Sequence, residues 1–315
     1  MGAYIVRRLV QMVPVVLLVT VFVFLMLTLS GDPITLLSGG GEALDEEQIA
    51  ALRAQYNLDR PILVQYGLWL GKVFTGDLGT SVITRQPVTY ELKSRIPVTL
   101  ELGFFAWLFS LVIAIPTGVL SATRRGSLAD GTATVLTMAG LAIPGFWLGI
   151  MLIFLFAVNW RILPPFGFVS IFSNPIEGIQ YQALPIISLG LGAAALNMRQ
   201  MRSAMLEVLA QDYVRTARAK GLKERSVIWR HAFRNSVLPV VTIMGLQIGR
   251  IIGGAVVVEN IFAISGVGRL LVQSILNRDF PVVQAIVLII SVAVLLSNLV
   301  TDMLYAYIDP RIRYT

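Results

Sequence analysis

The chain has 315 residues, of which 56% are hydrophobic and 14% are charged; it contains no cysteine and has a formal charge of +7. The absence of cysteine excludes a disulfide-built secreted domain and any thiol chemistry. A basic balance in so apolar a chain indicates the charge distribution of a membrane protein rather than nucleic-acid binding.

Long uncharged runs divide the chain. A helix of about 20 apolar residues crosses the ~30 Å of hydrocarbon in a bilayer. Five runs meet that length, at residues 9–31, 102–123, 131–160, 178–198 and 280–301. A sixth, 235–258, is interrupted only by Arg250. We therefore predict an all-α membrane protein with six transmembrane helices.

The segments between the runs differ in charge. With a cytoplasmic N-terminus, the inner pieces 1–8, 124–130, 199–234 and 308–315 hold 15 Lys and Arg against five acidic residues, whereas 32–97 holds six against eight. Basic residues concentrate on the cytoplasmic side of membrane proteins. We predict a multi-pass protein of the cytoplasmic (inner) membrane with both termini in the cytoplasm and a short tail at 308–315.

The first run follows Arg7 and Arg8, as the apolar part of a signal peptide follows basic residues. The run exceeds 20 residues, and no small-residue cleavage site comes after it. We therefore predict that residues 1–31 form a retained transmembrane helix rather than a removed leader.

The segment 32–97 is too short and too polar to bury a core of its own. We predict one helix from Asp45 to Tyr56 and a second from Pro61 to about Phe74, followed by a turn-rich element at 76–81. Two interpretations stay open for this extracytoplasmic segment. It contacts another protein outside the membrane, or it packs as a lid over the ends of the transmembrane helices. The five-helix core then extends over 98–307.

Two features of the middle runs bear on whether their helices line a path through the membrane. Pro144-Gly145 interrupts the run 131–160, and a proline inside a helix removes a backbone hydrogen bond and kinks it. The helix either lines a path or is kinked for structural reasons. The fourth run is rich in Gly and Ala, which permits close helix packing in lipid. Asn197 and Arg199 lie at the inner end of this run. They either form part of a cytoplasmic gate or anchor the helix at the membrane interface.

The last two runs carry polar residues at membrane depth, Gln247 and Arg250 among them. A charge there is costly and should face a polar cavity or a carboxylate such as Glu101 or Glu259. Arg250 either lines the path or its outer gate, or forms a structural ion pair between helices.

Asn298 and Asp302 lie four residues apart and therefore share one helix face in the last run. They either polarise the path or form hydrogen bonds with a neighbouring helix.

The charge of the chain is concentrated in one interval, because nine of its 25 Lys and Arg lie between Arg199 and Arg234. Apolar residues recur with helical spacing from Leu206 to Ala217 and again from Val227 to Phe233, which predicts two short amphipathic helices. Lys220-Gly221 is typical of a helix C-terminus. Such a helix pair can dock in a partner's groove; the alternative is a basic loop that only fixes the topology.

The string Arg215-Thr216-Ala217-Arg218-Ala219-Lys220-Gly221, followed by His231, Asn235 and Pro239, resembles the EAA loop of ABC-importer permeases. The general pattern is Glu-Ala-Ala, three residues, then Gly. This chain has Arg and Thr in the first two positions, which is the usual form in the dipeptide, oligopeptide and nickel branch. No role tied to the Glu carboxylate is expected here. The resemblance covers the chain and is densest after residue 253, in GGAVVVENIF, SGVGRLL, NRDFPVVQA and SNLVTDMLYAYIDPRIRY.

The resemblance implies a type I ABC-importer permease fold with a cytoplasmic coupling helix in the loop 203–236. The coupling residues would be Arg215, Thr216, Ala217, Arg218, Ala219, Lys220, Gly221 and Leu222, seated in a cleft of an ATPase subunit. Candidate residues of the translocation path or gate are Asn197, Arg199, Gln247, Arg250, Asn298 and Asp302.

The resemblance also implies partners. They are a second, homologous permease in a heterodimer, two ABC ATPase subunits, an extracytoplasmic substrate-binding protein and membrane lipid, with no nucleic acid. The cargo would be di- or oligopeptides; nickel chelates, glutathione or another small solute are alternatives within the same architecture. A stand-alone secondary transporter is the alternative of a different class.

Motifs of catalysis are missing from the sequence. It contains no G-x-x-x-x-G-K-[ST], no HExxH and no GxSxG. Without a P-loop, the chain is expected not to bind ATP in that way. We therefore predict a non-catalytic permease subunit without a cofactor of its own, with ATP and Mg held by the partner ATPases.

Overall fold

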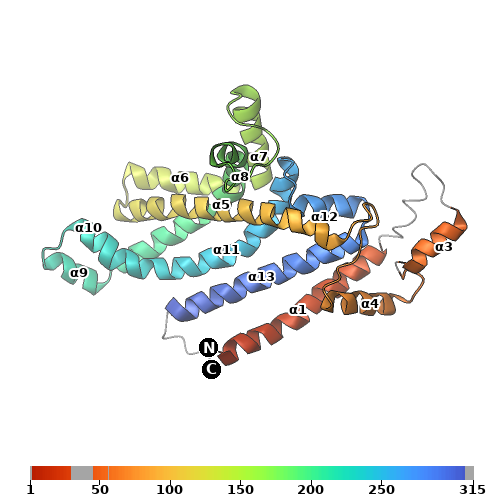
Figure 1. Ribbon diagram of the computed structural model, residues 1–315. Coiled ribbons are helices and arrows are strands. Elements are labelled where there is room, and N and C mark those ends of the chain that lie inside the picture. Colours follow the sequence, from red (N-terminus) through yellow and green to blue (C-terminus); the bar gives the residue numbers. More distant parts are fainter. Residues whose placement is uncertain (1, 30–44, 56, 309–315) are drawn as a thin grey trace. The chain divides into compact units, whose positions relative to one another are not determined.

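The computed structural model describes residues 2–29, 45–55 and 57–308, and within these ranges some side chains, that of Arg250 among them, lie outside the description. Every regular element of the described residues is helical (Figure 1). Their one β-type pairing is an isolated bridge between Thr80 and Pro87. The prediction of an all-α protein is confirmed.

The chain forms two compact units, each built from two stretches of sequence. Unit 1 comprises Met1–Val98 and Ser265–Leu295, and unit 2 comprises Thr99–Ile264 and Leu296–Thr315. The long helices α5 (Val88–Thr123) and α13 (Phe280–Ile308) contribute to both. The predicted division into segments at 31, 97 and 307 stays a prediction.

Unit 1 contains α1 (Gly2–Leu29), α3 (Glu46–Gln55), α4 (Ile62–Phe74), α12 (Val267–Leu276) and the first parts of α5 and α13. The helices predicted at 45–56 and 61–74 correspond to α3 and α4. The core of the unit consists of Val88, Leu92, Val267, Leu270, Val282, Ala285 and Ile286. Elements far apart in the sequence thus share one apolar cluster.

Helix α4 lies against α1 (Figure 1). The Tyr66 hydroxyl is 3.0 Å from the Thr20 hydroxyl, and the Tyr66 ring meets Phe24 edge to face with ring centroids 5.5 Å apart. Pro61 precedes α4 with a φ of −55°, a value that its ring imposes and that suits the entry to a helix. Within segment 32–97, the described residues thus include two helices, of which α4 packs on α1.

A buried carboxylate fixes the turn-rich element of unit 1. Asp279, between α12 and α13, is 3% exposed; it accepts the Ser81 hydroxyl and, at 3.1 Å, the backbone N–H of Val82. Burial raises the pKa of the Asp279 carboxyl, and the hydrogen bonds from Ser81 and Val82 oppose that rise. This network anchors residues 80–88 beside the first turn of α13.

Unit 2 is organised around α8 (Pro175–Leu209), which packs against α6 (Leu128–Ala142), α7 (Gly145–Leu152) and α11 (Phe233–Ile261) (Figure 1). Gly190 of α8 permits a close approach to α5, because a Cβ there would lie 2.6 Å from the Ala106 carbonyl oxygen. One core cluster of the unit contains Val119, Ala122, Met201, Met205, Ala232, Val240 and Met244. Small residues in the fourth predicted run thus serve close packing, as the sequence indicated.

Four described helices are long and apolar enough to span a membrane: α1, α5, α8 and α13. A fifth span arises if α6 and the pair formed by α7 and the π-helix η1 (Ile153–Asn159) count as one, although the two parts are bent by 103°. The break falls at Ile143-Pro144, where the sequence predicts a kink. The sixth predicted run, 235–258, lies within α11, which is not among these candidate spans. The count of six therefore stays a prediction.

One predicted boundary differs from the structure. Leu206 and Leu209, placed by periodicity on the first short amphipathic helix, belong to the last turn of α8. The helix breaks at Ala210-Gln211, and α9 (Asp212–Ala219) begins there. The apolar spacing continues in phase across this break, so periodicity alone did not reveal it.

Candidate functional site

Helix α9 has a buried and an exposed face. Val214 is fully buried and Ala217 is 6% exposed; both pack against Val227, beneath the last turn of α8. The opposite face is solvent-exposed and consists of Arg215, Thr216, Arg218, Ala219, Lys220 and Leu222. We refer to residues 210–236 as the α9–η2 segment. Its buried residues fix α9 on the unit, and its exposed residues stay available for a partner.

The turn after α9 depends on Gly221, which has a φ of +74°. Its N–H donates to the Arg218 carbonyl at 2.9 Å, and the Leu222 N–H donates to the Ala217 carbonyl at 3.4 Å. Only glycine adopts this left-handed conformation without a steric cost. The helix end predicted at Lys220-Gly221 is confirmed.

The chain returns from this turn through α10 (Glu224–Ser226) and the π-helix η2 (Val227–Ala232), which continues into α11. Arg218 forms a two-point ion pair with Glu224, with Nε–Oε2 at 3.2 Å and Nη2–Oε1 at 2.7 Å. Hydrogen bonding within the pair raises the pKa of Arg218 and lowers the pKa of Glu224. Both side chains are exposed, so the pair contributes more to geometry than to stability.

A second tie closes the α9–η2 segment. Asn235 Nδ2 donates to the Tyr213 hydroxyl at 2.8 Å, and that hydroxyl is 3.5 Å from the His231 carbonyl. Asn235 and His231 follow RTARAKG in the sequence pattern that resembles the EAA loop. Their contacts with Tyr213 hold α9 against the start of α11.

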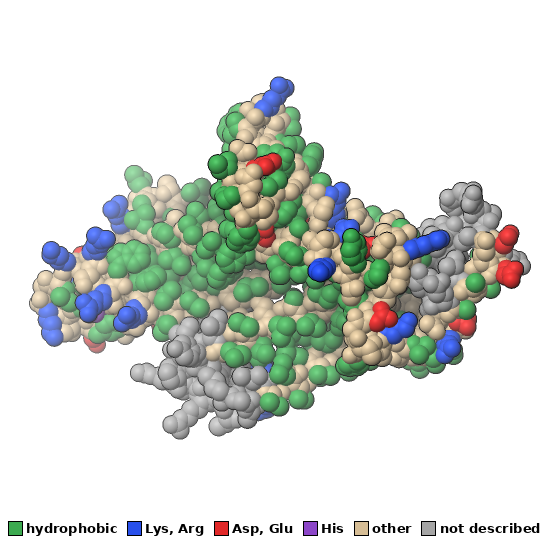
Figure 2. Space-filling model, in the orientation of Figure 1, with side chains coloured by type: hydrophobic (Ala, Val, Ile, Leu, Met, Phe, Trp, Pro, Cys, Tyr) green, Lys and Arg blue, Asp and Glu red, His purple; other side chains and the backbone are tan. Residues whose placement is uncertain are grey.

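The exposed surface of the segment is strongly basic. Figure 2 shows Lys and Arg side chains gathered over α9 and α10. Trp229 is 48% exposed beside them and contacts the Phe233 ring, with centroids 5.2 Å apart and the planes tilted by 55°. A rigid basic surface with an exposed aromatic ring can bind an acidic groove of another protein.

Two of the predicted path residues meet inside unit 2. Gln247 Nε2 donates to Asn197 Oδ1 at 2.8 Å, and Asn197 Nδ2 lies 3.4 Å from the Ser110 hydroxyl oxygen. Gln247 is 3% exposed, and its Oε1 has no hydrogen-bond partner among the described residues. Ser110 completes the chain of polar groups; as one of several serines in apolar runs, it had no signal in the sequence.

Gln247 also lines a cavity of about 460 Å³ in unit 2. The other lining residues are mainly apolar or small; they come from α6, α7, α8 and α11, and include Gly140, Phe146, Ser188 and Gly254. A buried carbonyl oxygen without a donor, next to an apolar space, is suited to accept a hydrogen bond from a guest or a water molecule.

The other predicted path residues are not brought into this group. Arg199 is exposed on α8, and Asn298 and Asp302 lie half-buried on α13. The side chain of Arg250 lies outside the described part of the structure, so its partner stays a prediction.

The carboxylates named as partners of Arg250 have contacts of their own. Glu101 accepts hydrogen bonds from the Ser170 hydroxyl at 2.7 Å and from the Ile171 N–H at 2.6 Å. Glu259 is fully buried and accepts the Thr99 hydroxyl at 2.6 Å.

A two-point ion pair between α8 and the start of α6 was not expected. Arg202 Nε is 2.8 Å from Asp130 Oδ1, and its Nη2 is 3.0 Å from Oδ2. Asp130 also accepts the Ser121 hydroxyl and, at 3.0 Å, the Gly126 N–H. The pair joins the short loop 124–130 to α8. The residues lie far apart in the sequence, and neither forms part of a motif.

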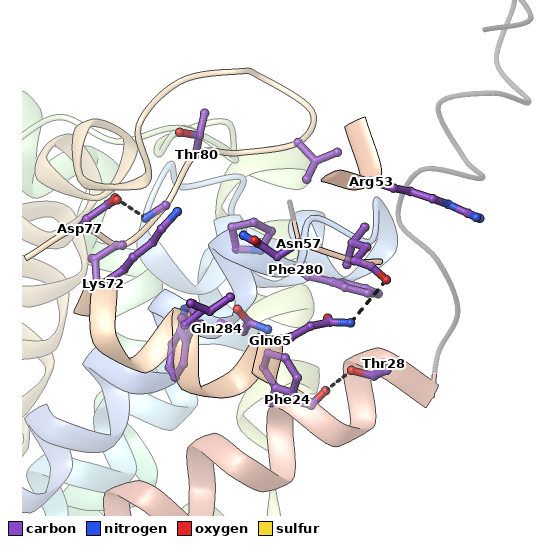
Figure 3. Close-up of a pocket in the computed structure, with 17 residues that line it drawn as sticks. Phe24, Thr28, Arg53, Asn57, Gln65, Lys72, Asp77, Thr80, Phe280 and Gln284 are labelled. Carbon is purple, nitrogen blue, oxygen red and sulfur yellow. Dashed lines mark hydrogen bonds between the residues drawn. The ribbon is translucent and has the colours of Figure 1, made fainter. Parts of the chain in front are cut away.

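Unit 1 contains a cavity of about 580 Å³ that the sequence did not predict (Figure 3). It lies among the end of α1, the residues after α3, α4, the turn after α4 and the start of α13. Phe24, Trp69 and Phe280 provide its aromatic wall; Asn57, Lys72, Asp77 and Gln284 provide polar groups. No group of three or more His, Asp or Glu side chains suited to a metal ion occurs among the described residues.

Comparison with known families gives two matches that together span nearly the whole chain. Residues 114–314 match the "Binding-protein-dependent transport system inner membrane component" family, and residues 1–103 match its N-terminal region model. The family model covering residues 114–314 contains the α9–η2 segment and both buried path residues.

Individual relatives align over the full length. The chain is 41% identical to the dipeptide transport system permease protein DppB of Escherichia coli, with 99% of this chain and 98% of that protein covered. It is 43% identical to the oligopeptide transport system permease protein AppB of Bacillus subtilis, with complete coverage of both. Among solved structures, a chain of the inward-facing MetNI methionine ABC transporter shares the fold, with a TM-score of 0.58, 19% identity and coverage of 70% of this chain and 97% of that one.

Proposed function

The chain belongs to the family of inner membrane components of binding-protein-dependent transport systems, and on that premise we propose that it is the permease subunit of an ATP-driven importer of di- and oligopeptides. One observation carries the proposal: a chain that aligns over its whole length with peptide permeases presents RTARAKG on a helix and turn whose Arg and Lys side chains are exposed.

The proposed role of the α9–η2 segment is to transmit force. The exposed residues among Arg215 to Leu222 bind an ATPase subunit, while Val214 and Ala217 anchor α9 to the end of α8. Because α10 and η2 run without a break into α11, a displacement of the ATPase-bound residues of α9 moves α11 as well. ATP and Mg belong to the ATPase subunits, and this chain contributes no catalytic group.

The proposed assembly contains a second permease subunit, two ATPase subunits and an extracytoplasmic binding protein. Movement of the ATPase-bound segments, driven by nucleotide binding and hydrolysis, would switch the permease between outward- and inward-facing states. A ligand or nucleotide shifts such an equilibrium only by its difference in binding free energy between the two states. In this account the binding protein and ATP provide that difference, and the chain is oriented with both termini in the cytoplasm.

The proposed path passes the buried pair Asn197 and Gln247. The free Oε1 of Gln247 offers an acceptor to the backbone N–H groups that every peptide carries, which suits a carrier of many sequences. Arg199, Asn298 and Asp302 take positions near the inner gate, and Arg250 lies farther along α11.

Uptake by cells tests the function. A strain that lacks the chain is complemented with the wild-type gene and supplied with a labelled dipeptide. Unlabelled dipeptides, tripeptides, glutathione and a nickel chelate are then added as competitors. Competition by peptides is the expected result, and competition by glutathione or the chelate alone would contradict the peptide assignment. Copurification of ATPase subunits distinguishes the importer from a stand-alone secondary transporter.

A further inference from the structure

The cavity of unit 1 has the size and composition of a small-molecule site. Its volume of about 580 Å³ falls within the roughly 300–1,000 Å³ of ligand pockets. Three aromatic rings line it: Phe24 is 6% exposed, Phe280 is 8% exposed, and Trp69 is partly buried. An apolar wall with a few polar groups is the usual design of such pockets.

A buried amide faces this space. Gln284 is 9% exposed and lies on the cavity wall, on the first turns of α13 (Figure 3). Its side chain forms no hydrogen bond with another residue that the structure describes, in contrast to Gln65 nearby, whose Nε2 donates to the Arg60 carbonyl at 2.7 Å. A side-chain amide has both donors and an acceptor, and so it can pair with the amide of a peptide bond.

Three charged residues line the cavity, Arg53, Lys72 and Asp77, and the last two form a pair of opposite charges at its rim. Lys72 lies in the last turn of α4, and Asp77 follows in the turn, its N–H donating to the Lys72 carbonyl at 3.0 Å. Asp77 uses Oδ1 to accept the Gly79 N–H at 2.8 Å. Among the described interactions its second oxygen has no donor, and the Lys72 ammonium has no carboxylate partner. Figure 3 shows both side chains together at one side of the view, with Phe280 and Phe24 farther along the cavity.

We propose that this cavity binds short zwitterionic peptides on the side of the membrane that the charge bias assigns to the outside. Lys72 pairs with the C-terminal carboxylate, and Asp77 with the N-terminal ammonium. Gln284 pairs with the peptide bond, and the rings of Phe24 and Phe280 contact an apolar side chain. The inference rests on the proposed function and adds to it a second substrate site, distinct from the buried pair Asn197 and Gln247.

An anionic lipid headgroup is the competing occupant. A phosphate would use Lys72 but would place its charge near Asp77, whereas a peptide uses both charges. The buried amide of Gln284 likewise matches a peptide bond and has no counterpart in an acyl chain. The chemistry therefore favours the peptide, and the experiment below separates the two.

Photolabelling of the assembled transporter tests the site. The complex is placed in nanodiscs without the binding protein, and a dipeptide carrying a diazirine side chain is titrated and activated. The expected labels fall in α4, in the turn at 75–82 and in the first turns of α13. Excess unlabelled dipeptide should suppress them, and a dipeptide with a C-terminal amide should suppress them less.

Variants identify the contacts. Lys72→Gln and Asp77→Asn should each raise the half-labelling concentration about 2- to 5-fold, as expected for rim charges; Asn keeps an acceptor for Gly79. Gln284→Leu should raise it about 2- to 10-fold. In Lys72→Gln the preference for a free carboxylate should disappear. The matched changes Lys93→Gln and Asp59→Asn, at exposed residues outside the cavity, should leave labelling unchanged.

The outcomes separate this inference from the proposed function. Labelling at positions outside the cavity of unit 1, or an equal half-labelling concentration in all variants, would overturn the inference even if the complex imports peptides normally. Labelling that appears only when anionic lipid is omitted would assign the cavity to lipid and also overturn it. Failure of the wild-type complex with its binding protein to import any peptide would instead refute the proposed function.

Discussion

Gly221 determines how the α9–η2 segment is presented, and substitutions there test the coupling role. Its φ of +74° is disfavoured for residues with a Cβ, by roughly 1–2 kcal/mol. A Cβ at this position would have no heavy atom within 4 Å in the described structure, so only the backbone conformation opposes substitution. The turn can be perturbed without a steric clash that would disturb the rest of the chain.

Three variants form a graded series. Asn tolerates the left-handed region, so Gly221→Asn should behave almost as wild type. Gly221→Ala should lose about 1 kcal/mol, which corresponds to about 5-fold weaker association with the ATPase subunits. Gly221→Val, with a β-branched side chain, should lose the most, because such a residue is an outlier at positive φ.

Copurification of the ATPase subunits and dipeptide uptake measure the series, with the amount of chain in the membrane as the control. Copurification and uptake should both decrease in the order Gly221→Asn, Gly221→Ala, Gly221→Val. Equal loss in all three variants would refute the conformational argument. Unchanged association in Gly221→Val would show that the segment is no seat for the ATPase.

Three further predictions concern other residues. Asp130→Asn should lower the free energy of unfolding of the purified chain, because it removes the charge that pairs with two nitrogens of Arg202; the loss should be smaller than at a fully buried pair, since 30% of the Arg202 side chain is exposed. Asp212→Asn, at an exposed pair, is the control, and equal effects of the two changes in a thermal unfolding assay would contradict this expectation. Burial raises the pKa of Asp279 above its unfolded value of 3.8. The carboxyl's contribution to stability is therefore complete below pH 3.8 and is lost as the pH rises through the folded pKa. Asp279→Asn should remove this fall from the curve of unfolding temperature against pH, and an unaltered curve would exclude Asp279 as its source. Gln247→Leu should reduce dipeptide uptake about 2- to 10-fold at unchanged assembly, through loss of one hydrogen bond, and uptake at the wild-type rate would remove Gln247 from the path.

Local patterns in the sequence were sufficient where one short stretch contains the whole cause. Pro144-Gly145 predicts a break and the structure has one, bent by 103°. Gly221 after Lys220 predicts a helix end, and the positive φ is present. Pro61 predicts the start of α4. In each case the backbone chemistry of one or two residues determines the conformation, independent of tertiary contacts.

Features that depend on distant residues could not be predicted in the same way. The pair of Arg202 with Asp130 and the network of Asp279 with Ser81 join residues that lie 72 and 198 positions apart. The cavity of unit 1 needs α1, α4 and α13 in place before its wall exists. Of the predicted path residues, Asn197 and Gln247 met, whereas Arg199 is exposed; sequence polarity alone does not tell which of them face each other.

The most direct test of the account is crosslinking from the α9–η2 segment in the assembled transporter. The chain has no cysteine, so Lys220→Cys introduces a unique thiol on the exposed face of α9. With a short thiol-reactive photocrosslinker attached, the account predicts a covalent product with an ATPase subunit, in a yield that changes between the ATP-bound and nucleotide-free states. A thiol that reacts freely with a water-soluble maleimide in the active complex, and forms no product with an ATPase subunit in either state, would contradict it.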